Sequence, residues 1–199
     1  MADESGCAIS IPIGSGTGTV ACRNFAVTRI IAVMLDAEGV LELLAELGIA
    51  HRTWTHAPVF TVDEAKAERG DLEGAHIKNL FLRNKKGRMW LVTCLEDRRL
   101  DLRRLGSALG AGRLSFASVE RLSKHLGVIP GAVTPLAVVN DTQGLVELVL
   151  DKAIFGHPLV NVHPILNSMT TALHPEDLLR YAEHTGHPGR VVDLGEFLD

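Results

Sequence analysis

The stretch that decides the fold runs His76-Ile-Lys-Asn-Leu-Phe-Leu-Arg83, then Asn84-Lys-Lys-Gly87 and, after one arginine, Met89-Trp-Leu-Val-Thr-Cys-Leu95. Two apolar segments of strand length flank a polar turn that ends in glycine, which is the pattern of a β-hairpin. Side chains alternate between the two faces of a strand, so Lys78 shares a face with Leu80 and Leu82. The hairpin therefore carries a lysine on an apolar face.

Lys78 has two interpretations at this point. An inward ammonium loses hydration unless a partner or a pocket compensates for the loss. Lys78 is then either a side chain that reaches back to water at the end of its strand or a functional cation in a cleft.

The rest of the chain predicts helices and strands in irregular order. Helical spacing and capping residues predict helices over 36–48, 61–70, 98–109, 119–126 and 175–185. Extended segments are predicted over 51–56, 136–140, 145–150 and 159–163, and a short apolar run lies at 114–116. Because no regular βαβ rhythm and no internal repeat appear, we expect an α+β fold: one domain with a mixed β-sheet or partly closed barrel and surrounding helices.

Composition indicates an ordinary globular protein of the cytoplasm. The chain has 199 residues, which suits one domain, and its three cysteines show neither CxxC nor Cys/His spacing, so no disulfide framework and no zinc site are indicated. No cofactor and no metal ion are expected. Apolar runs near the start are too short for a membrane span, and the charge pattern is not that of a signal peptide.

Residues 1–33 form a segment rich in Gly, Ser and Thr with weak periodicity, and Met34 opens the patterned part of the chain. We interpret residues 1–33 as an N-terminal extension, either disordered or foreign to the native chain, and residues 34–199 as the domain. Gly14-Ser-Gly-Thr-Gly18 lacks the spacing of a phosphate loop.

Two further segments carry polar groups in unusual places. In the strand 159–163, Asn161 and His163 share a face, which is either the solvent side of a sheet or the polar floor of a ligand site. The segment Gly127–Pro135 holds two Gly and two Pro in nine residues, and its amides either bind a carbonyl oxygen or belong to a plain crossover.

Charge is unevenly distributed along the chain. From Arg83 to Lys124 there are 11 basic and four acidic residues, a net of +7, whereas from Asp141 on there are nine acidic and three basic residues, a net of -6. The basic middle is either a solvated surface or a contact for nucleic-acid phosphates. The candidate phosphate contacts are Arg83, Lys85, Lys86, Arg98, Arg99 and Arg113, with Arg103 and Arg104 nearby.

Taken together, three ordered motifs resemble the YbaK/ProX-type aminoacyl-tRNA deacylase family, relatives of the editing domain of bacterial prolyl-tRNA synthetases. They are the strand Ala75–Leu82 with Lys78, the loop Gly131-Ala-Val-Thr-Pro135 with the family's GxxxP form, and the segment Asn161–Thr171 with its NxHPxxN form. The likeness runs from about Met34 to the C-terminus and is greatest to the stand-alone ProX type. Leu166 and Met169 depart from the family by replacing smaller or hydroxyl-bearing residues.

This resemblance implies a trans-editing deacylase that hydrolyses mischarged alanyl-tRNA(Pro), with tRNA(Pro) and prolyl-tRNA synthetase as partners. It implies that Lys78 is the essential group, and that the substrate is bound by Asn79, Gly131, Ala132, Val133, Thr134, Pro135, Asn161 and His163. Lys78 and the amides of the Gly131 loop are expected to stabilise the charge on the ester carbonyl oxygen. No carboxylate or unhindered histidine presents itself as a base, so the substrate's ribose hydroxyl is expected to orient the water.

Two alternatives remain at this stage. A cysteinyl-tRNA(Pro) deacylase of the same fold would also use Lys78, and a non-enzymatic tRNA-binding module would use only the basic middle. We expect residues 1–33 to be dispensable for activity.

Overall fold

A computed structural model describes residues 34–58 and 72–198 of the chain. The helix predicted over 61–70 and the N-terminal extension lie outside these residues. Within them, no helix is both long enough and apolar enough to cross a membrane.

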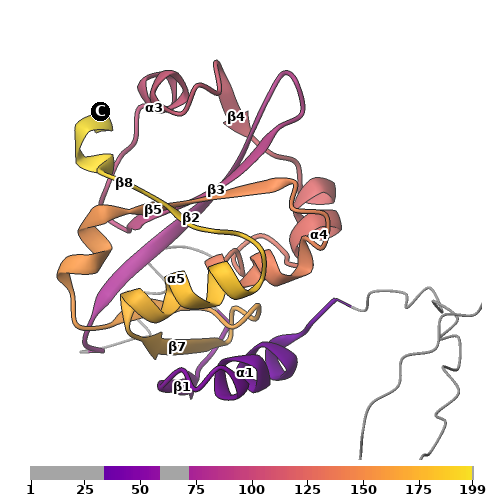
Figure 1. The fold of residues 1–199 in the computed structure, drawn as a ribbon, viewed down its shortest axis with the longest axis vertical. Coiled ribbons are helices and arrows are strands. Elements are labelled where there is room, and N and C mark those ends of the chain that lie inside the picture. The colour runs from indigo at the N-terminus through magenta and orange to yellow at the C-terminus, as the bar shows by residue number, and fades with distance from the viewer. Residues whose placement is uncertain (1–33, 59–71, 199) are drawn as a thin grey trace, which may run out of the picture. The chain divides into compact units, whose positions relative to one another are not determined.

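A mixed β-sheet forms the centre of this part of the chain (Figure 1). Its strands follow the order β1-β7-β6-β2-β3-β5-β8, and β4 pairs with β2 outside that path. The strands are β1 (His51–Thr55), β2 (Ala75–Asn84), β3 (Met89–Leu95), β4 (Leu114–Phe116), β5 (Val146–Asp151), β6 (Val160–Val162), β7 (Met169–Leu173) and β8 (Arg190–Val192). The mixed sheet is confirmed, but the described strands form an open sheet and not a partly closed barrel.

Helices surround the sheet. The α-helices are α1 (Ala37–Glu46), α3 (Leu102–Ala108), α4 (Val119–Leu126) and α5 (Pro175–His184), and the 3-10 helices are η1 (Pro135–Asn140), η2 (Lys152–Gly156) and η3 (Leu194–Phe197). Asp36 caps α1 as the sequence predicts, by accepting a hydrogen bond from the Gly39 amide, and Ser118 caps α4 by accepting one from the Arg121 amide.

The hairpin of β2 and β3 separates two cores. Phe81 projects from one face of β2 into the larger core, which includes buried side chains of α1, α4, α5 and η1. Leu82 projects from the other face into a smaller core with residues of α3, β4 and η3. Lys78 shares the side of Leu82, because the two lie an even number of residues apart. We call these two sides the Phe81 face and the Lys78 face.

A buried contact ties the end of α5 to the turn before β5. Nε2 of His187 lies 3.2 Å from the carboxylate of Asp141, and Nδ1 of His187 donates to the Thr185 carbonyl. The same carboxylate accepts a hydrogen bond from the Val146 amide, and both His187 and Asp141 are buried. Asp141 therefore joins three segments at one edge of the larger core.

Two predicted elements are wrong in type or extent. Residues 136–140 belong to the 3-10 helix η1 and do not form a strand. The Thr134 hydroxyl accepts a hydrogen bond from the Leu136 amide, and Pro135 is the first residue of the helix. The helix predicted over 98–109 begins only at Leu102, where Asp101 caps it. Strands β7 and β8 are absent from the prediction.

Candidate active site

Lys78 lies near the start of β2, and its half-buried side chain reaches the turn that follows β3. Its ammonium donates a hydrogen bond to the backbone carbonyl of Arg98. Cys94 is its neighbour on β3, and burial raises the pKa of the Cys94 thiol to about 12, although the positive charge of Lys78 opposes this shift. The thiol is therefore protonated at neutral pH, and Cys94 is a buried core residue.

The structure brings Asn161 to the same face as Lys78. Strand β6 runs parallel to β2, with Asn161 paired to His76, so Asn161 shares the Lys78 face. His163 directly follows β6, two residues after Asn161 and beyond the residues that pair with β2. Asn161 and Lys78 thus share a face of the sheet, and the association of His163 with them stays a prediction.

The side chain of Asn161 is buried and only half satisfied. Its amide nitrogen donates to the carbonyl of Glu73 at 2.9 Å, with a longer contact of 3.4 Å to the carbonyl of Ala75. Its Oδ1 is shielded from solvent and has no hydrogen-bond partner in the described chain. Because a buried acceptor without a donor is costly, Oδ1 is suited to receive a hydrogen bond from a ligand or a water molecule.

His163 has a defined tautomer. Nδ1 lies 2.8 Å from the Met169 carbonyl, and a carbonyl can only accept, so Nδ1 carries the proton. Burial lowers the pKa of His163, with a smaller contribution from the nearby His56, and keeps the ring neutral at pH 7. Nε2 then presents a lone pair, so His163 is a base that the sequence analysis did not single out.

Two residues extend this polar row across the sheet, and sequence reasoning missed both. The His56 and His163 ring centroids lie 6.3 Å apart, and Nε2 of His56 lies 2.9 Å from the hydroxyl of Thr170. His56 follows β1, and Thr170 lies on β7, which pairs with β1. The signal would have been the alternation of polar residues on β7, but that strand was not predicted.

Backbone strain marks the segment after His163. Ile165 has φ of 65°, in the left-handed region that a β-branched residue rarely adopts. Such strain persists only where the surroundings impose it, and it gathers at functional sites. The turn that carries His163 is therefore held in an unfavourable conformation.

The Gly131–Pro135 loop contacts the opposite side of β2. The amide of Asn79 donates to the Val133 carbonyl at 2.8 Å, and its oxygen accepts from the buried Thr93 hydroxyl at 2.7 Å. Asn79 lies on the Phe81 face, since it is adjacent to Lys78 in the strand. The described contacts thus attach the loop to the face opposite Lys78 and do not bring its amides to the ammonium.

The remaining residues of the Gly131–Pro135 loop have structural contacts or conformations of their own. The Ala132 amide donates to the Ile129 carbonyl at 3.0 Å, and the Ala132 side chain is buried in the larger core. Gly131 has φ of 89°, which explains a glycine there. Thr134 and Pro135 are buried at the start of η1.

The six predicted phosphate contacts fall into two groups. One group, Arg83, Lys85 and Lys86, lies at the hairpin turn. Arg113 belongs to this group, because Leu114, which follows it, pairs with Asn84. Arg98 and Arg99 lie at the other end of the hairpin, about 23 Å away at 3.3 Å per residue. Arg99, Lys85, Lys86 and Arg113 are exposed, and Arg83 is half-buried.

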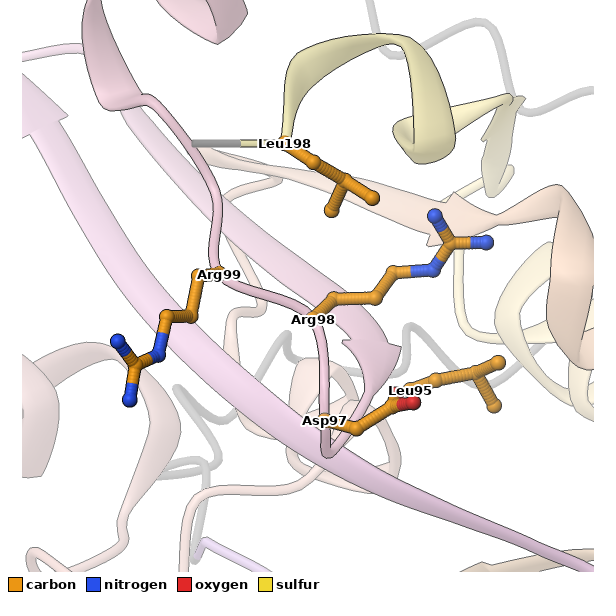
Figure 2. A pocket seen from close by; sticks show the side chains of 5 residues that line it. All are labelled: Leu95, Asp97, Arg98, Arg99 and Leu198. Carbon is orange, nitrogen blue, oxygen red and sulfur yellow. The ribbon is translucent and has the colours of Figure 1, made fainter.

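Arg98 differs from the other five. Its Nε lies 2.6 Å from the carboxylate of the buried Asp151, so its charge is already paired. Figure 2 shows the guanidinium groups of Arg98 and Arg99 pointing in opposite directions. Both residues line a cavity of about 360 Å³. Leu95, Asp97 and Leu198 complete its lining. Of the two arginines, only Arg99 is free of an ion pair in the described chain.

No group of three or more His, Cys, Asp or Glu side chains is arranged to hold a metal ion in residues 34–58 and 72–198. The polar groups of Lys78, His163 and Asn161 are an ammonium, a neutral imidazole and an unpaired amide oxygen. This set suits the hydrolysis of an ester with a charged amino group nearby.

Comparison with known proteins agrees with this chemistry. Residues 56–181 match the family model described as an aminoacyl-tRNA editing domain. The chain is 40% identical over 164 residues to the prolyl-tRNA editing protein ProX of Acetoanaerobium sticklandii, which covers 80% of this chain and 99% of that protein.

Two further proteins are similar along most of their length. The prolyl-tRNA synthetase associated domain-containing protein 1 of Bos taurus is 44% identical over 156 residues, covering 76% of this chain and 91% of that protein. A crystal structure of a candidate trans-editing enzyme for prolyl-tRNA synthetase superposes with a TM-score of 0.62 at 27% identity, covering 79% of this chain and 95% of that one. The matched family range contains all three sequence motifs.

Proposed function

We propose that this chain, which belongs to the aminoacyl-tRNA editing domain family, removes alanine from mischarged tRNA(Pro) as a free-standing enzyme. Family membership confirms the expected enzyme class, a hydrolase of the aminoacyl-tRNA ester bond. The choice of alanine and of tRNA(Pro) is the proposal. It is supported by the similarity to a protein named for prolyl-tRNA editing.

The observation that carries the proposal is the shared face of Lys78 and Asn161, with His163 two residues after Asn161. Water attacks the ester carbonyl carbon, and Nε2 of His163 takes the proton that the water loses. The Lys78 ammonium stabilises the negative charge on the carbonyl oxygen, a contribution typically worth about 3 to 4 kcal/mol. The carbonyl–ribose bond then breaks, and the ribose oxygen recovers the proton from His163.

Asn161 has a separate part in the proposal. The α-ammonium of the amino acid needs an acceptor in a site that excludes water, and Oδ1 of Asn161 is a buried acceptor without a donor. A hydrogen bond between them orients the ester beside Lys78. Asn79 then contributes indirectly, because its amide is already bound to the Gly131 loop.

Selectivity for alanine follows from size. A synthetase pocket built for proline does not strongly reject a smaller side chain, since each missing methylene is worth only about 1 to 3 kcal/mol. A second site that admits alanine and excludes the proline ring corrects this error. The turn of His163, which contains the strained Ile165, would form a wall of that site.

The proposal places the protein in the cytoplasm, with tRNA(Pro) as substrate and prolyl-tRNA synthetase as the source of the mischarged product. The exposed Arg99 would contact the tRNA near its 3′ end, and the group at the hairpin turn would contact phosphates farther along the acceptor arm. Such contacts give affinity that does not depend on the base sequence.

The test measures release of radiolabelled alanine from alanyl-tRNA(Pro) by the full-length protein. We expect Lys78→Ala to lower kcat by about 100- to 1000-fold, in line with the removal of one oxyanion donor, while the circular dichroism spectrum stays unchanged. Prolyl-tRNA(Pro) should remain charged. Near-normal turnover by Lys78→Ala contradicts the mechanism, and faster release of cysteine than of alanine contradicts the substrate.

A further inference from the structure

We infer that Arg98 and Asp151 are positioning residues for Lys78: their ion pair keeps the Asp151 carboxylate from capturing the Lys78 ammonium and holds the turn whose carbonyl binds that ammonium. The inference rests on the proposed function only for the chemical role of Lys78. It also gives Arg98 a part other than the phosphate contact expected from the sequence.

Lys78 and Asp151 lie on one face of the sheet with Cys94 between them. Lys78 of β2 pairs with Cys94 of β3. Strands β3 and β5 are parallel and Thr93 pairs with Leu150, so one residue farther along both strands Cys94 lies beside Asp151. Both Lys78 and Asp151 influence the Cys94 thiol electrostatically, which agrees with this row. Two strand spacings separate Lys78 from Asp151, about 10 Å between their backbones.

Asp151 is a fully buried carboxylate at the end of β5. One of its oxygens accepts a hydrogen bond from the Ala153 amide at 3.1 Å, and the other lies 2.6 Å from Nε of Arg98. The Arg98 side chain is only 15% exposed. Without Arg98, the carboxylate would be a buried charge, and the long cations on its face would be Lys78 and Arg190, of which Arg190 already lies 3.6 Å from Glu147.

The backbone of Arg98 is held as firmly as its side chain. Its amide donates to the Leu95 carbonyl at 3.2 Å, which closes the turn after β3. Leu100, two residues later, forms a β-bridge with Leu198 of the C-terminal segment. The Arg98 carbonyl that accepts from Lys78 is thus fixed by the turn, by the bridge and by the ion pair.

These interactions set the charge that Lys78 senses. The titratable and charged groups that the described chain places around it are His76, Cys94, Asp97, Arg98, Asp151 and His163. Arg98 and Asp151 cancel each other, so Lys78 faces no net charge from the pair. Removing the charge of Arg98 exposes Lys78 to an anion, and removing that of Asp151 exposes it to a cation.

The experiment measures how readily Lys78 is modified as the pH is raised. Full-length protein is treated with formaldehyde and a borohydride, which methylate only uncharged amines, and the peptide that contains Lys78 is quantified by mass spectrometry. We expect the pH of half-maximal labelling to rise in Arg98→Met and to fall in Asp151→Asn. Each shift should be a few tenths of a unit to about one unit.

Two further variants make the test specific. The double variant Arg98→Met/Asp151→Asn removes both charges, so its labelling midpoint should return to the wild-type value, and it leaves no unpaired buried charge that could prevent folding. Arg180→Met removes an exposed Arg–Asp pair on α5 and should leave the midpoint unchanged. Deacylation kcat should fall at least 10-fold in both single variants, with a smaller change in KM.

Opposite shifts in the two single variants and their cancellation in the double variant support the inference. Shifts of the two single variants in the same direction, or no shift in either, overturn it. Labelling does not depend on turnover, so an inactive wild-type protein would refute the proposed function while the labelling data still decide the role of Arg98 and Asp151.

Discussion

Asn79 clamps the glycine–proline loop to the sheet: its amide nitrogen lies 2.8 Å from the Val133 carbonyl, and its oxygen accepts from Thr93. These hydrogen bonds lie on the face of β2 opposite Lys78. The family motif therefore encloses two different functions, a cation on one side of the strand and a structural clamp on the other.

Asn79→Ala tests the clamp. The variant loses two hydrogen bonds and leaves the Val133 carbonyl and the Thr93 hydroxyl without a partner, so we expect the free energy of unfolding to fall by about 1 to 3 kcal/mol in urea titrations. Ser107→Ala, which removes an exposed side-chain bond, is the control and should change stability by less than about 0.5 kcal/mol. Equal stability of the two variants would show that Asn79 does not hold the loop.

His163 predicts the acid limb of the pH–rate profile. Burial lowers its pKa, so kcat should fall on acidification with a midpoint below 6.5, where Nε2 becomes protonated. His163→Asn retains a donor near the position of Nδ1 but has no Nε2, and it should abolish this limb together with most of the activity. An unchanged limb in His163→Asn would assign it to another group.

The same shift has a consequence for stability. Below pH 6.5 the unfolded chain takes up a proton that the folded chain binds less readily, so the contribution of His163 is present above this pH and is lost as the pH falls. Urea titrations at pH 7.5 and pH 5.5 should therefore show a smaller loss of stability in His163→Asn than in the wild type.

The hairpin turn should contribute to tRNA affinity. In Lys85→Ala/Lys86→Ala we expect weaker binding of tRNA and a salt dependence whose slope falls by about 0.7 to 0.9 for each phosphate that is no longer neutralised. Lys152→Ala, an exposed lysine in the acidic half of the chain, serves as the control. If both variants show the same slope in filter-binding assays, the hairpin turn does not bind phosphates.

Asp141→Ala tests the joint at the edge of the larger core. It removes the acceptor of the buried Val146 amide and the carboxylate that contacts Nε2 of His187, so we expect a loss of about 1 to 3 kcal/mol in the free energy of unfolding. Asp177→Ala breaks an exposed pair with Arg180 and should cost less than about 1 kcal/mol. Similar losses in the two variants would contradict the role of Asp141.

A chain that begins at Met34 tests the proposed division into an N-terminal extension and a domain. The family match lies within 56–181, so we expect this shortened chain to retain deacylase activity and its thermal unfolding temperature. Loss of alanine release from alanyl-tRNA(Pro) would show that residues 1–33 take part in the reaction.

Local pattern predicts much of this fold and part of the site. Alternation placed Lys78 on the correct face, and the helix predicted over 119–126 has the bounds of α4. Residues 136–140 were assigned wrongly, because an apolar run gives no periodicity and the Tyr181 hydroxyl that bonds the Leu136 carbonyl comes from a distant helix. The ion pair between Arg98 and Asp151 was not predicted either, because nothing in the sequence distinguishes Asp151 from a polar residue that ends an ordinary strand.

The pairing of β1 with β7 also bears on how the protein reaches its folded state. Thr53 and Thr171 share a hydrogen bond across 118 residues of sequence, and the same strand pair brings His56 and Thr170 together. Such long-range interactions slow folding, because the intervening chain loses conformational entropy before the strand pair can stabilise the fold. On the ribosome, the row that contains His163 therefore assembles only after nearly all of the domain has emerged.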